Sequence, residues 1–394
     1  MGGTEMNEWK KLKLGELYEV HNGLSKGRQF FGSGYPFLTF STVFNNWFLP
    51  EILDSLVQSS DKEREACSIK RGDVFITRTS ETMDELGMSS VALKDYPNAT
   101  YNGFTKRLRP TTDDVIPEYI GYYLRSKKFR GKFMAFSSMT TRASLANDDL
   151  LSMVVEIPEK SIQQHIATIL SHYDSLIENY QKQIKLLEEA AQRLYKEWFV
   201  DLHFPGHENT KIVDGVPEGW EKKTLDSFCN VFTGKKNANQ SVPNGEYKFF
   251  TCGDTPLLIN SFIYDGPAII ISGNGSYTGR TTFYEGKFDL YQRTYACTLK
   301  DADNSDLIYG LYEIVKRELT NKILGGTHGA AIPYIVMSDL TKFDFLFNES
   351  IIHRFSITIK NLLSLSLKLS NNIRLLTEAR DRLLPKLMSG EIAV

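Results

Sequence analysis

Apolar side chains return at alternating intervals of four and three residues over two long stretches of the chain. In residues 162–199, all ten such positions are apolar or aromatic. They are Ile166, Leu170, Tyr173, Ile177, Tyr180, Ile184, Leu187, Ala191, Leu194 and Trp198. A second stretch, 189 residues later, keeps eight of ten apolar: Phe355, Ile359, Leu362, Ser366, Leu369, Ile373, Leu376, Arg380, Leu383 and Leu387. A stripe with this 3.5-residue period is typical of a coiled-coil helix.

Each of these helices needs a partner to cover its stripe. Residues 162–199 would form a helix about 57 Å long at 1.5 Å per residue. The two stripes agree in length and phase, so we predict an antiparallel pair within one chain, with globular domains at opposite ends. The alternative is that each helix packs on its own domain. Complementary charge favours pairing: the acidic residues are Glu178, Glu188, Glu189 and Glu197, and the basic ones Arg374, Arg380, Arg382 and Lys386.

The sequence before each helix has a different texture, with short β-branched and aromatic runs broken by Gly, Pro, Asn and Asp. Such runs predict strands joined by turns, for example at 73–77, 101–104, 268–272 and 281–284, with short helices at 117–124 and 306–317. The fold class we predict is α+β. Its four parts are a globular domain at 1–158, a helical spacer at 159–211, a second globular domain at 212–346 and a second helix at 347–394.

The two halves of the chain repeat each other. Trp9, Leu14, Leu17, Val20 and Gly23 recur 211 positions later, as Trp220, Leu225, Phe228, Val231 and Gly234. A second match links the two helices at an offset of 189: Ile184, Leu186, Leu187, Glu189, Ala190, Arg193 and Leu194 recur as Ile373, Leu375, Leu376, Glu378, Ala379, Arg382 and Leu383. A duplicated chain usually does one job at two places, here with a pseudo-two-fold relation between the halves.

Composition narrows the class of protein without identifying it. The formal net charge of −2, from 46 basic and 48 acidic side chains, lacks the basic excess of many nucleic-acid binders. Any contact with DNA must therefore depend on local patches. The four cysteines are far apart and form no metal-binding pair. No apolar run is long enough to span a membrane, and the N-terminus lacks the apolar segment of a signal peptide, so we expect a cytoplasmic protein.

The residues at the junctions resemble a known family. They are Asp149, Leu150, Ile157, Pro158, Gln164, Asp174 and Ile177, with the C-terminal run RLLPKLMSGEI at 382–392. Together with the duplication, they resemble the specificity (S) subunit of type I restriction–modification systems over nearly the whole chain. The resemblance implies two target-recognition domains, each reading half of a bipartite DNA site. It also implies helices that act as spacer and as docking surface for modification subunits, and through them for restriction subunits. S-adenosylmethionine and ATP with Mg²⁺ are expected in those partners, with no cofactor in this chain.

Basic and polar loop residues are the candidates for DNA contact. Those of the first domain are Lys26, Arg28, Arg78, Lys106, Arg107 and Arg142, and those of the second are Lys235, Lys236, Asn274, Ser276, Tyr277, Arg280 and His328. Such side chains suit phosphate and base-edge contacts. Arg78 and Arg142 lie in polar loops that align with Gly-rich loops of the second copy, and Lys235 and Lys236 appear opposite Lys26 and Arg28. The alternatives are a solvated basic face and plain strand-connecting turns. Because the loops diverge between copies, we expect an asymmetric site.

Motifs for chemistry are missing from the sequence. There is no Pro-Pro dipeptide for an amino-methyltransferase, no Walker A motif, no G-x-S-x-G and no metal-ligand spacing. The chain therefore reads as a recognition protein whose partners do the chemistry. Candidate partner contacts are Tyr195, Trp198, Phe199 and Leu387; the alternative is an apolar cap inside the chain. The rival functions are a coiled-coil scaffold for proteins and a nuclease with unfamiliar motifs.

Overall fold

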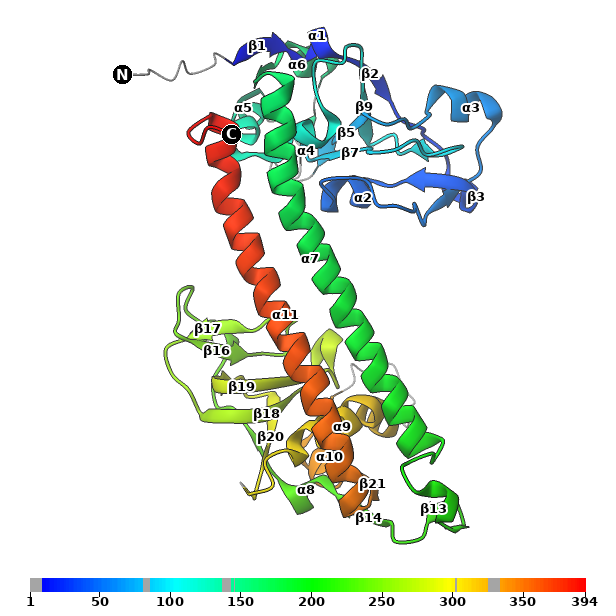
Figure 1. Cartoon of the computed structure of the whole chain (residues 1–394), viewed down its shortest axis with the longest axis vertical. Helices are drawn as coiled ribbons and strands as arrows, with labels where there is room; N and C mark the ends of the chain where they lie inside the picture. The colour runs from blue at the N-terminus through cyan, green and yellow to red at the C-terminus, as the bar shows by residue number, and fades with distance from the viewer. Residues whose placement is uncertain (1–8, 81–85, 137–142, 145, 302, 325–333) are drawn as a thin grey trace. The chain divides into compact units, whose positions relative to one another are not determined.

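The protein forms two compact units, which share two long helices (Figure 1). The computed structural model describes residues 9–80, 86–136, 143–144, 146–301, 303–324 and 334–394. Unit 1 comprises Met1–Glu178 and Ile373–Val394, and unit 2 comprises Asn179–Asn372. Both units take part of helix α7 (Lys160–Tyr195) and part of helix α11 (Glu349–Ser389). The boundaries predicted at 158, 211 and 346 separate globular domains from helices. The two units are instead divided within the helices, at 178/179 and 372/373, so the predicted boundaries stay a prediction.

Unit 1 is a mixed sheet structure with helices around it. A four-stranded sheet has the order β2 (Tyr18–Asn22), β9 (Thr105–Pro110), β5 (Val74–Thr77), β7 (Ser89–Val91). A three-stranded sheet has the order β4 (Leu56–Val57), β3 (Phe31–Leu38), β8 (Thr100–Tyr101). Two ladders complete it: β1 (Lys10–Lys13) with β11 (Val154–Ile157), and β6 (Thr79–Ser80) with β10 (Ala143–Ser144). The helices are α1 (Leu14–Leu17), α2 (Phe40–Asn45), α3 (Asp61–Ala66), α4 (Pro117–Arg125), α5 (Lys127–Phe136) and α6 (Asn147–Ser152).

Unit 2 has one larger sheet of six strands. Their order is β15 (Cys229–Thr233), β20 (Thr294–Leu299), β18 (Tyr264–Ser272), β19 (Thr281–Leu290), β16 (Tyr247–Phe250), β17 (Leu257–Ile259). Shorter ladders join β14 (Glu221–Thr224) to β21 (Asp344–Phe347), and β12 (Ile212–Val213) to β13 (Val216–Pro217). The helices are α8 (Leu225–Phe228), α9 (Leu307–Leu324) and α10 (Met337–Thr341). The α+β class is confirmed in both units, as are the helices predicted near 117 and 306.

The strand order shows the internal repeat directly. The order β2-β9-β5-β7 in unit 1 matches β15-β20-β18-β19 in unit 2. A parallel pair also recurs: β3 with β8, in the separate three-stranded sheet of unit 1, places Phe37 opposite Thr100, and β16 with β19 in unit 2 places Phe249 opposite Asp289. The ladder β1–β11 likewise corresponds to β14–β21. The duplication read from the sequence is therefore a duplication of the fold.

The repeated glycine of the sequence motif marks a tight backbone crossing in each unit. A Cβ added at Gly23 would overlap the carbonyl oxygen of Asn102, and one added at Gly234 would overlap that of Leu290. Neither crossing has room for a side chain, since the obstacle is backbone. This explains why both copies carry glycine at the end of their matching motifs.

Substituting either glycine should therefore destabilise its unit. We expect G23A and G234A each to lower the free energy of unfolding by about 1 to 3 kcal/mol, because the backbone must move to admit the methyl group. Urea unfolding of the full chain, followed by circular dichroism, measures this. G131A is the matched control: its Cβ meets nothing within 4 Å in helix α5, so it should be neutral or slightly stabilising. Equal losses in all three variants would contradict the explanation.

Helices α7 and α11 run antiparallel, and this is visible within each unit. In unit 1, Ile166 and Leu170 of α7 share a core with Leu384, Leu387 and Met388 near the end of α11. Further along α7, the Asp174 carboxylate accepts a 2.6 Å hydrogen bond from Arg380. The residue numbers thus rise along α7 as they fall along α11. Arg380 is one of the basic residues predicted to favour pairing, whereas Asp174 is not among the predicted acidic residues.

Unit 2 shows the same antiparallel direction at the other ends of the two helices. The ring centroids of Trp198 and Phe199 lie 5.8 and 4.9 Å from that of Phe355, near the start of α11. Ala191, an earlier residue of α7, packs in a core with Ile359, a later residue of α11. Helix pairing within the chain is therefore confirmed. Each helix also packs on a globular part, so the two arrangements considered from the sequence coexist.

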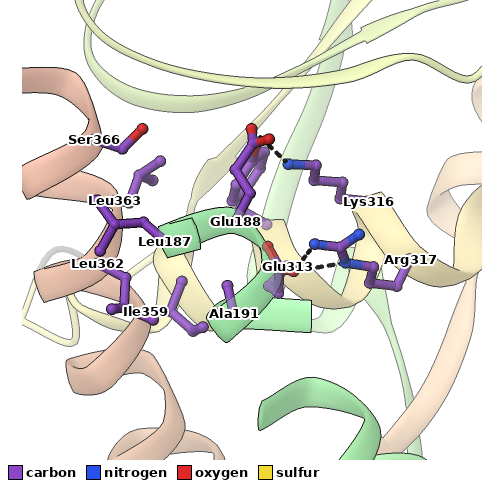
Figure 2. A pocket seen from close by; sticks show the side chains of 11 residues that line it. Leu187, Glu188, Ala191, Glu313, Lys316, Arg317, Ile359, Leu362, Leu363 and Ser366 are labelled. Atoms are coloured by element: carbon purple, nitrogen blue, oxygen red, sulfur yellow. Dashed lines mark hydrogen bonds and ion pairs between the residues drawn. The ribbon is translucent and has the colours of Figure 1, made fainter. Parts of the chain in front are cut away.

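The two polar residues of the second stripe, Arg380 and Ser366, have different surroundings. Arg380 is satisfied by Asp174, which also accepts a 2.6 Å hydrogen bond from Tyr122. Ser366 instead lines a small cavity of about 40 Å³ together with Leu187 and Leu362. Figure 2 shows the lining residues, which include the ion-paired Glu313 and Arg317. This space suits one or two water molecules and no larger ligand. The break in the apolar stripe at Ser366 therefore coincides with a small packing defect.

Candidate nucleic-acid interface

Four loops of unit 2 meet at one end of its sheet, and we call residues 234–237, 251–254, 273–280 and 291–293 loop cluster 2. Hydrogen bonds join them: the Gln292 amide donates to the Lys236 carbonyl (3.0 Å), and the Gly273 amide donates to the Arg293 carbonyl (2.9 Å). The thiol of Cys252 also donates to the Arg293 carbonyl at 3.2 Å. Loops distant in sequence are thus held together, which suits them for binding a common surface.

The Gly-rich loop gives cluster 2 its exposed polar side chains. A single 3-10 turn, Gly275–Tyr277, follows Asn274, and Gly275 and Gly279 have positive φ angles of 82° and 83°. Ser276, Tyr277 and Arg280 are exposed, and Asn274 is half-buried. The Arg280 guanidinium lies 5.3 Å from the Tyr277 ring centroid and 2.5 Å from the Asp254 carboxylate. An arginine held by an aromatic face presents a fixed donor array.

The two neighbouring lysines have different environments. Lys236 is held in place, since its Nζ lies 3.1 Å from the buried Asp289 carboxylate and also bonds the Ser261 hydroxyl. Lys235 is exposed, and the described residues show no hydrogen bond or ion pair to it. Lys236 therefore fixes the loop, and Lys235 is the cation available to bind an anion.

Sequence reasoning missed several members of cluster 2, among them Asn237, Gln292 and Arg293. Gln292 donates a 3.0 Å hydrogen bond from its side chain to the Asn237 side chain, and Arg293 is exposed. In the sequence the segment 291–293 looks like an ordinary turn between strands. Only the register of β18 with β20, which pairs Ser272 with Thr294, places it beside the Gly-rich loop.

Unit 1 has an equivalent set of loops, and we call residues 22–26, 78, 86–88 and 102–104 loop cluster 1. The Gly103 amide donates to the Leu24 carbonyl (2.9 Å), and the Arg78 amide donates to the Phe104 carbonyl (3.0 Å). These bonds match those of Gln292 and Gly273 in unit 2, so the expected alignment of Arg78 with the Gly-rich loop is confirmed. They also align Lys236 with Leu24, so its expected alignment with Lys26 and Arg28 is wrong.

Arg78 and Lys106 lie close together beside cluster 1. The Arg78 guanidinium is 3.4 Å from the Asn22 side-chain oxygen, and Lys106 bonds the Asn147 side chain. Burial lowers the pKa of Lys106, and the positive charge of Arg78 lowers it further. Lys106 is only 4% exposed, so the half-buried Arg78 is the cation of this pair with surface to offer a phosphate.

Lys26 and Arg28 lie on another part of unit 1. The Lys26 ammonium is 2.8 Å from the Glu63 carboxylate of α3 and lies 5.0 Å from the Phe30 ring centroid. That lysine, followed by the Ser60 backbone, lowers the pKa of Glu63 to about 2. Arg28 is exposed at the start of the short helix η1, Arg28–Phe30. Lys26 thus has an internal partner, and Arg28 is the exposed cation of this segment.

Most of the other basic residues of unit 1 hold its own structure together. Arg107 is only 2% exposed and donates to the Ser68 carbonyl at 2.7 Å. Its position in the central strand β9 explains its burial and leaves it no surface to offer DNA. Three further groups behave alike: Arg109 pairs with Asp73, Arg125 donates to backbone carbonyls of 43–46 and 89, and Lys128 and Lys132 both bind Glu156. Two other candidates, Arg142 and His328, lie outside the described residues.

The four predicted partner residues all contact other parts of the chain: two are buried, and Trp198 and Phe199 are half-buried. Tyr195 and Leu387 are buried, with the Tyr195 hydroxyl donating to Glu318 at 2.6 Å. Trp198 and Phe199 contact Phe355, and Phe199 also contacts Trp220 at 5.7 Å. The alternative left open by the sequence, an apolar cap inside the chain, is the arrangement found. A role of these four residues in binding a partner stays a prediction.

Metal-ligand groups and cysteines were the remaining candidates for chemistry in the described residues. Within them, no group of three or more His, Cys, Asp and Glu side chains could hold a metal ion. Burial raises the pKa of the Cys229 thiol to about 12, and that of Cys297 is raised as well. Over the same residues, no helix is long and apolar enough to cross a membrane.

Comparison with known proteins identifies the class. The family model described as "Type I restriction modification DNA specificity domain" matches residues 6–189 and 217–347, one match in each half of the chain. The chain therefore belongs to the family of type I restriction–modification DNA specificity proteins. The resemblance seen in its junction residues is confirmed.

Individual relatives agree with this membership. The chain is 25% identical to the type I restriction enzyme MjaIX specificity subunit of Methanocaldococcus jannaschii, over its whole length and 95% of that protein. It is 35% identical to the EcoDI specificity subunit of Escherichia coli, over 32% of this chain and 27% of that protein. The crystal structure of a type I S subunit from M. genitalium has the same fold, with a TM-score of 0.66 at 14% identity and 98% coverage of both chains.

Loop cluster 2 predicts which cations contribute to phosphate binding. We expect K235Q and R280Q each to reduce the slope of log K against log salt by about 0.9, because each removes one phosphate contact. Fluorescence anisotropy of the full chain with a duplex at several salt concentrations measures the slope. The matched control is K222Q, an exposed lysine of β14 outside the cluster. An equal reduction of the slope in K222Q would contradict this prediction. So would an unchanged slope in both K235Q and R280Q.

Proposed function

We propose that the chain reads a bipartite, asymmetric DNA site, one half with loop cluster 1 and the other with loop cluster 2. The observation that carries this proposal is the match between the clusters. Both use the same backbone hydrogen bonds, at Gly103 and Arg78 in one and at Gln292 and Gly273 in the other. A duplicated scaffold that repeats its loop framework suits one task performed twice.

The side chains on that framework differ between the two clusters. Matched positions in units 1 and 2 are Leu24 and Lys236, Arg78 and Gly273, Met88 and Arg280, and Phe104 and Arg293. Sequence is read by side chains at base edges, so different side chains favour different half-sites. We therefore propose a target without two-fold symmetry, in which Arg78, Lys235 and Arg280 supply phosphate contacts.

In this proposal the chain carries out no chemistry itself. Its loop clusters offer donors, cations and rings, which bind and position DNA. The methyl transfer would belong to modification subunits, which bring S-adenosylmethionine, and cleavage to restriction subunits that use ATP. Two observations support this division: the missing catalytic motifs of the sequence, and the membership of the chain in a family named for DNA specificity.

A repeated strip on the outer face of the long helices suits the docking of those subunits. Leu186, Glu189, Ala190 and Arg193 of α7 recur as Leu375, Glu378, Ala379 and Arg382 of α11. Both leucines are exposed, at 63% and 48%. Packing within the chain explains repeated residues that face inward, such as Leu187 and Leu376, but it does not explain a repeated outward strip. We propose that the two strips bind two copies of one modification subunit.

Sequencing of methylated DNA tests the reading function. The chain assembled with its modification subunits should methylate one bipartite sequence. Replacing residues 1–158 by those of another family member should change one half of that sequence and leave the other half intact. A methylated sequence that stays the same after the exchange would overturn the proposal.

Docking is tested on the two strips. We expect L186R and L375R each to weaken binding of the modification subunit at one strip by about tenfold or more, and the double variant to lose both copies, because a buried apolar contact becomes a charge. Mass photometry of the complex measures the stoichiometry. I357R is the matched control, since Ile357 is an exposed apolar residue of α11 whose repeat counterpart is Thr168. Two bound copies in the double variant would rule out these strips.

A further inference from the structure

Two equivalent turns of the loop clusters carry side chains of opposite character, an exposed aromatic ring at Phe104 and an exposed guanidinium at Arg293. We propose that Phe104 and Arg293 are specificity-determining residues: Phe104 contacts the 5-methyl group of a thymine in one half-site, and Arg293 binds the N7 and O6 edge of a guanine in the other. This inference rests on the proposed reading function and assigns its chemistry to particular bases.

The equivalence of Phe104 and Arg293 depends on the backbone alone. The carbonyl of each accepts a hydrogen bond from the residue that follows the central strand, Arg78 at 3.0 Å and Gly273 at 2.9 Å. The next residue in both turns is a buried threonine, which pairs across the sheet with Thr77 or with Ser272. The two side chains therefore leave the same framework at the same point.

Phe104 is exposed although it lies in a well-fixed turn. Its side chain is 59% exposed, and its amide donates to the Asn102 side chain at 2.6 Å. The turn is thus fixed while the ring faces solvent. Phosphates offer nothing to a ring without donors. In the major groove the apolar feature of a base edge is the thymine methyl group, which phenylalanine contacts favourably.

Arg293 has a fixed backbone and an available side chain. Its carbonyl accepts hydrogen bonds from Gly273 and Cys252. Lys236 of the same cluster is held by the buried Asp289, and Arg280, assigned above to a phosphate, lies beside the exposed Asp254. Among the described residues, no hydrogen bond or ion pair engages the Arg293 guanidinium. A guanidinium with two parallel donors matches guanine N7 and O6, whereas the ammonium of Lys235 is a point charge suited to phosphate.

Base analogues in the target duplex test both assignments. Once the methylated sequence is known, each thymine is replaced in turn by deoxyuridine, and each guanine by 7-deazaguanine, and binding of the assembled complex is measured. One thymine in the half-site of unit 1 and one guanine in that of unit 2 should each weaken wild-type binding by about tenfold. F104A should lose the response to deoxyuridine, and R293A should lose the response to 7-deazaguanine.

Conservative and control variants separate a specific contact from a general loss. F104L should keep part of the methyl response, and R293K should keep phosphate attraction but lose the guanine response. F262A, which removes an exposed ring of unit 2 outside the cluster, should leave both responses intact. A wild-type complex indifferent to every thymine methyl group, or an F104A complex that keeps the full response, would overturn the Phe104 assignment.

The same criteria apply to Arg293, and they separate this inference from the function on which it rests. A wild-type complex that tolerates 7-deazaguanine at every guanine, or an R293A complex with an unchanged response, would overturn the Arg293 assignment. A complex that methylates a bipartite site but fails these analogue tests would leave the reading function intact. A complex that methylates no bipartite sequence would overturn both.

Discussion

Both hydrophobic cores depend on the antiparallel pairing of helices α7 and α11. The core of unit 1 takes residues from the start of α7 and from the end of α11, including Leu170 and Leu387. The core of unit 2 takes residues from the opposite ends, including Ala191 and Phe355. Neither core is complete without both helices, because each apolar stripe would otherwise face water. The loop clusters are held in place by sheets that pack on these cores.

Most basic side chains discussed above are paired within the chain. A chain with a net charge of −2 can still present cations to DNA if its other cations are used internally. Arg109, Arg125 and Lys132 are bound by carboxylates or carbonyls within unit 1. Lys235 and Arg293 stay available in unit 2, since both are exposed and the described residues show no hydrogen bond or ion pair to either side chain. Local placement, and not overall charge, therefore decides where DNA can bind.

The sequence was sufficient for the elements whose pattern is long or repeated. The ten-position stripe of α7 and the motif from Trp9 to Gly23 predicted the helix pair and the duplication, because periodicity and spacing survive without knowledge of tertiary contacts. The sequence was insufficient to predict which individual basic residues are exposed. Arg107 and Arg78 look alike in sequence, yet one lies inside strand β9 and the other begins a loop. Arg293 was missed because strand register alone brings its turn to the Gly-rich loop.

The contribution of α11 to unit 1 also bears on how the protein is made. Leu384, Leu387 and Met388 complete a core that otherwise belongs to the first 178 residues. A growing polypeptide on the ribosome thus holds an unfinished core until residues 384–388 emerge. Products terminated before them lack the closing helix and expose apolar surface, which makes them substrates for chaperones and proteases. Synthesis through Met388 is therefore a condition for a stable first unit.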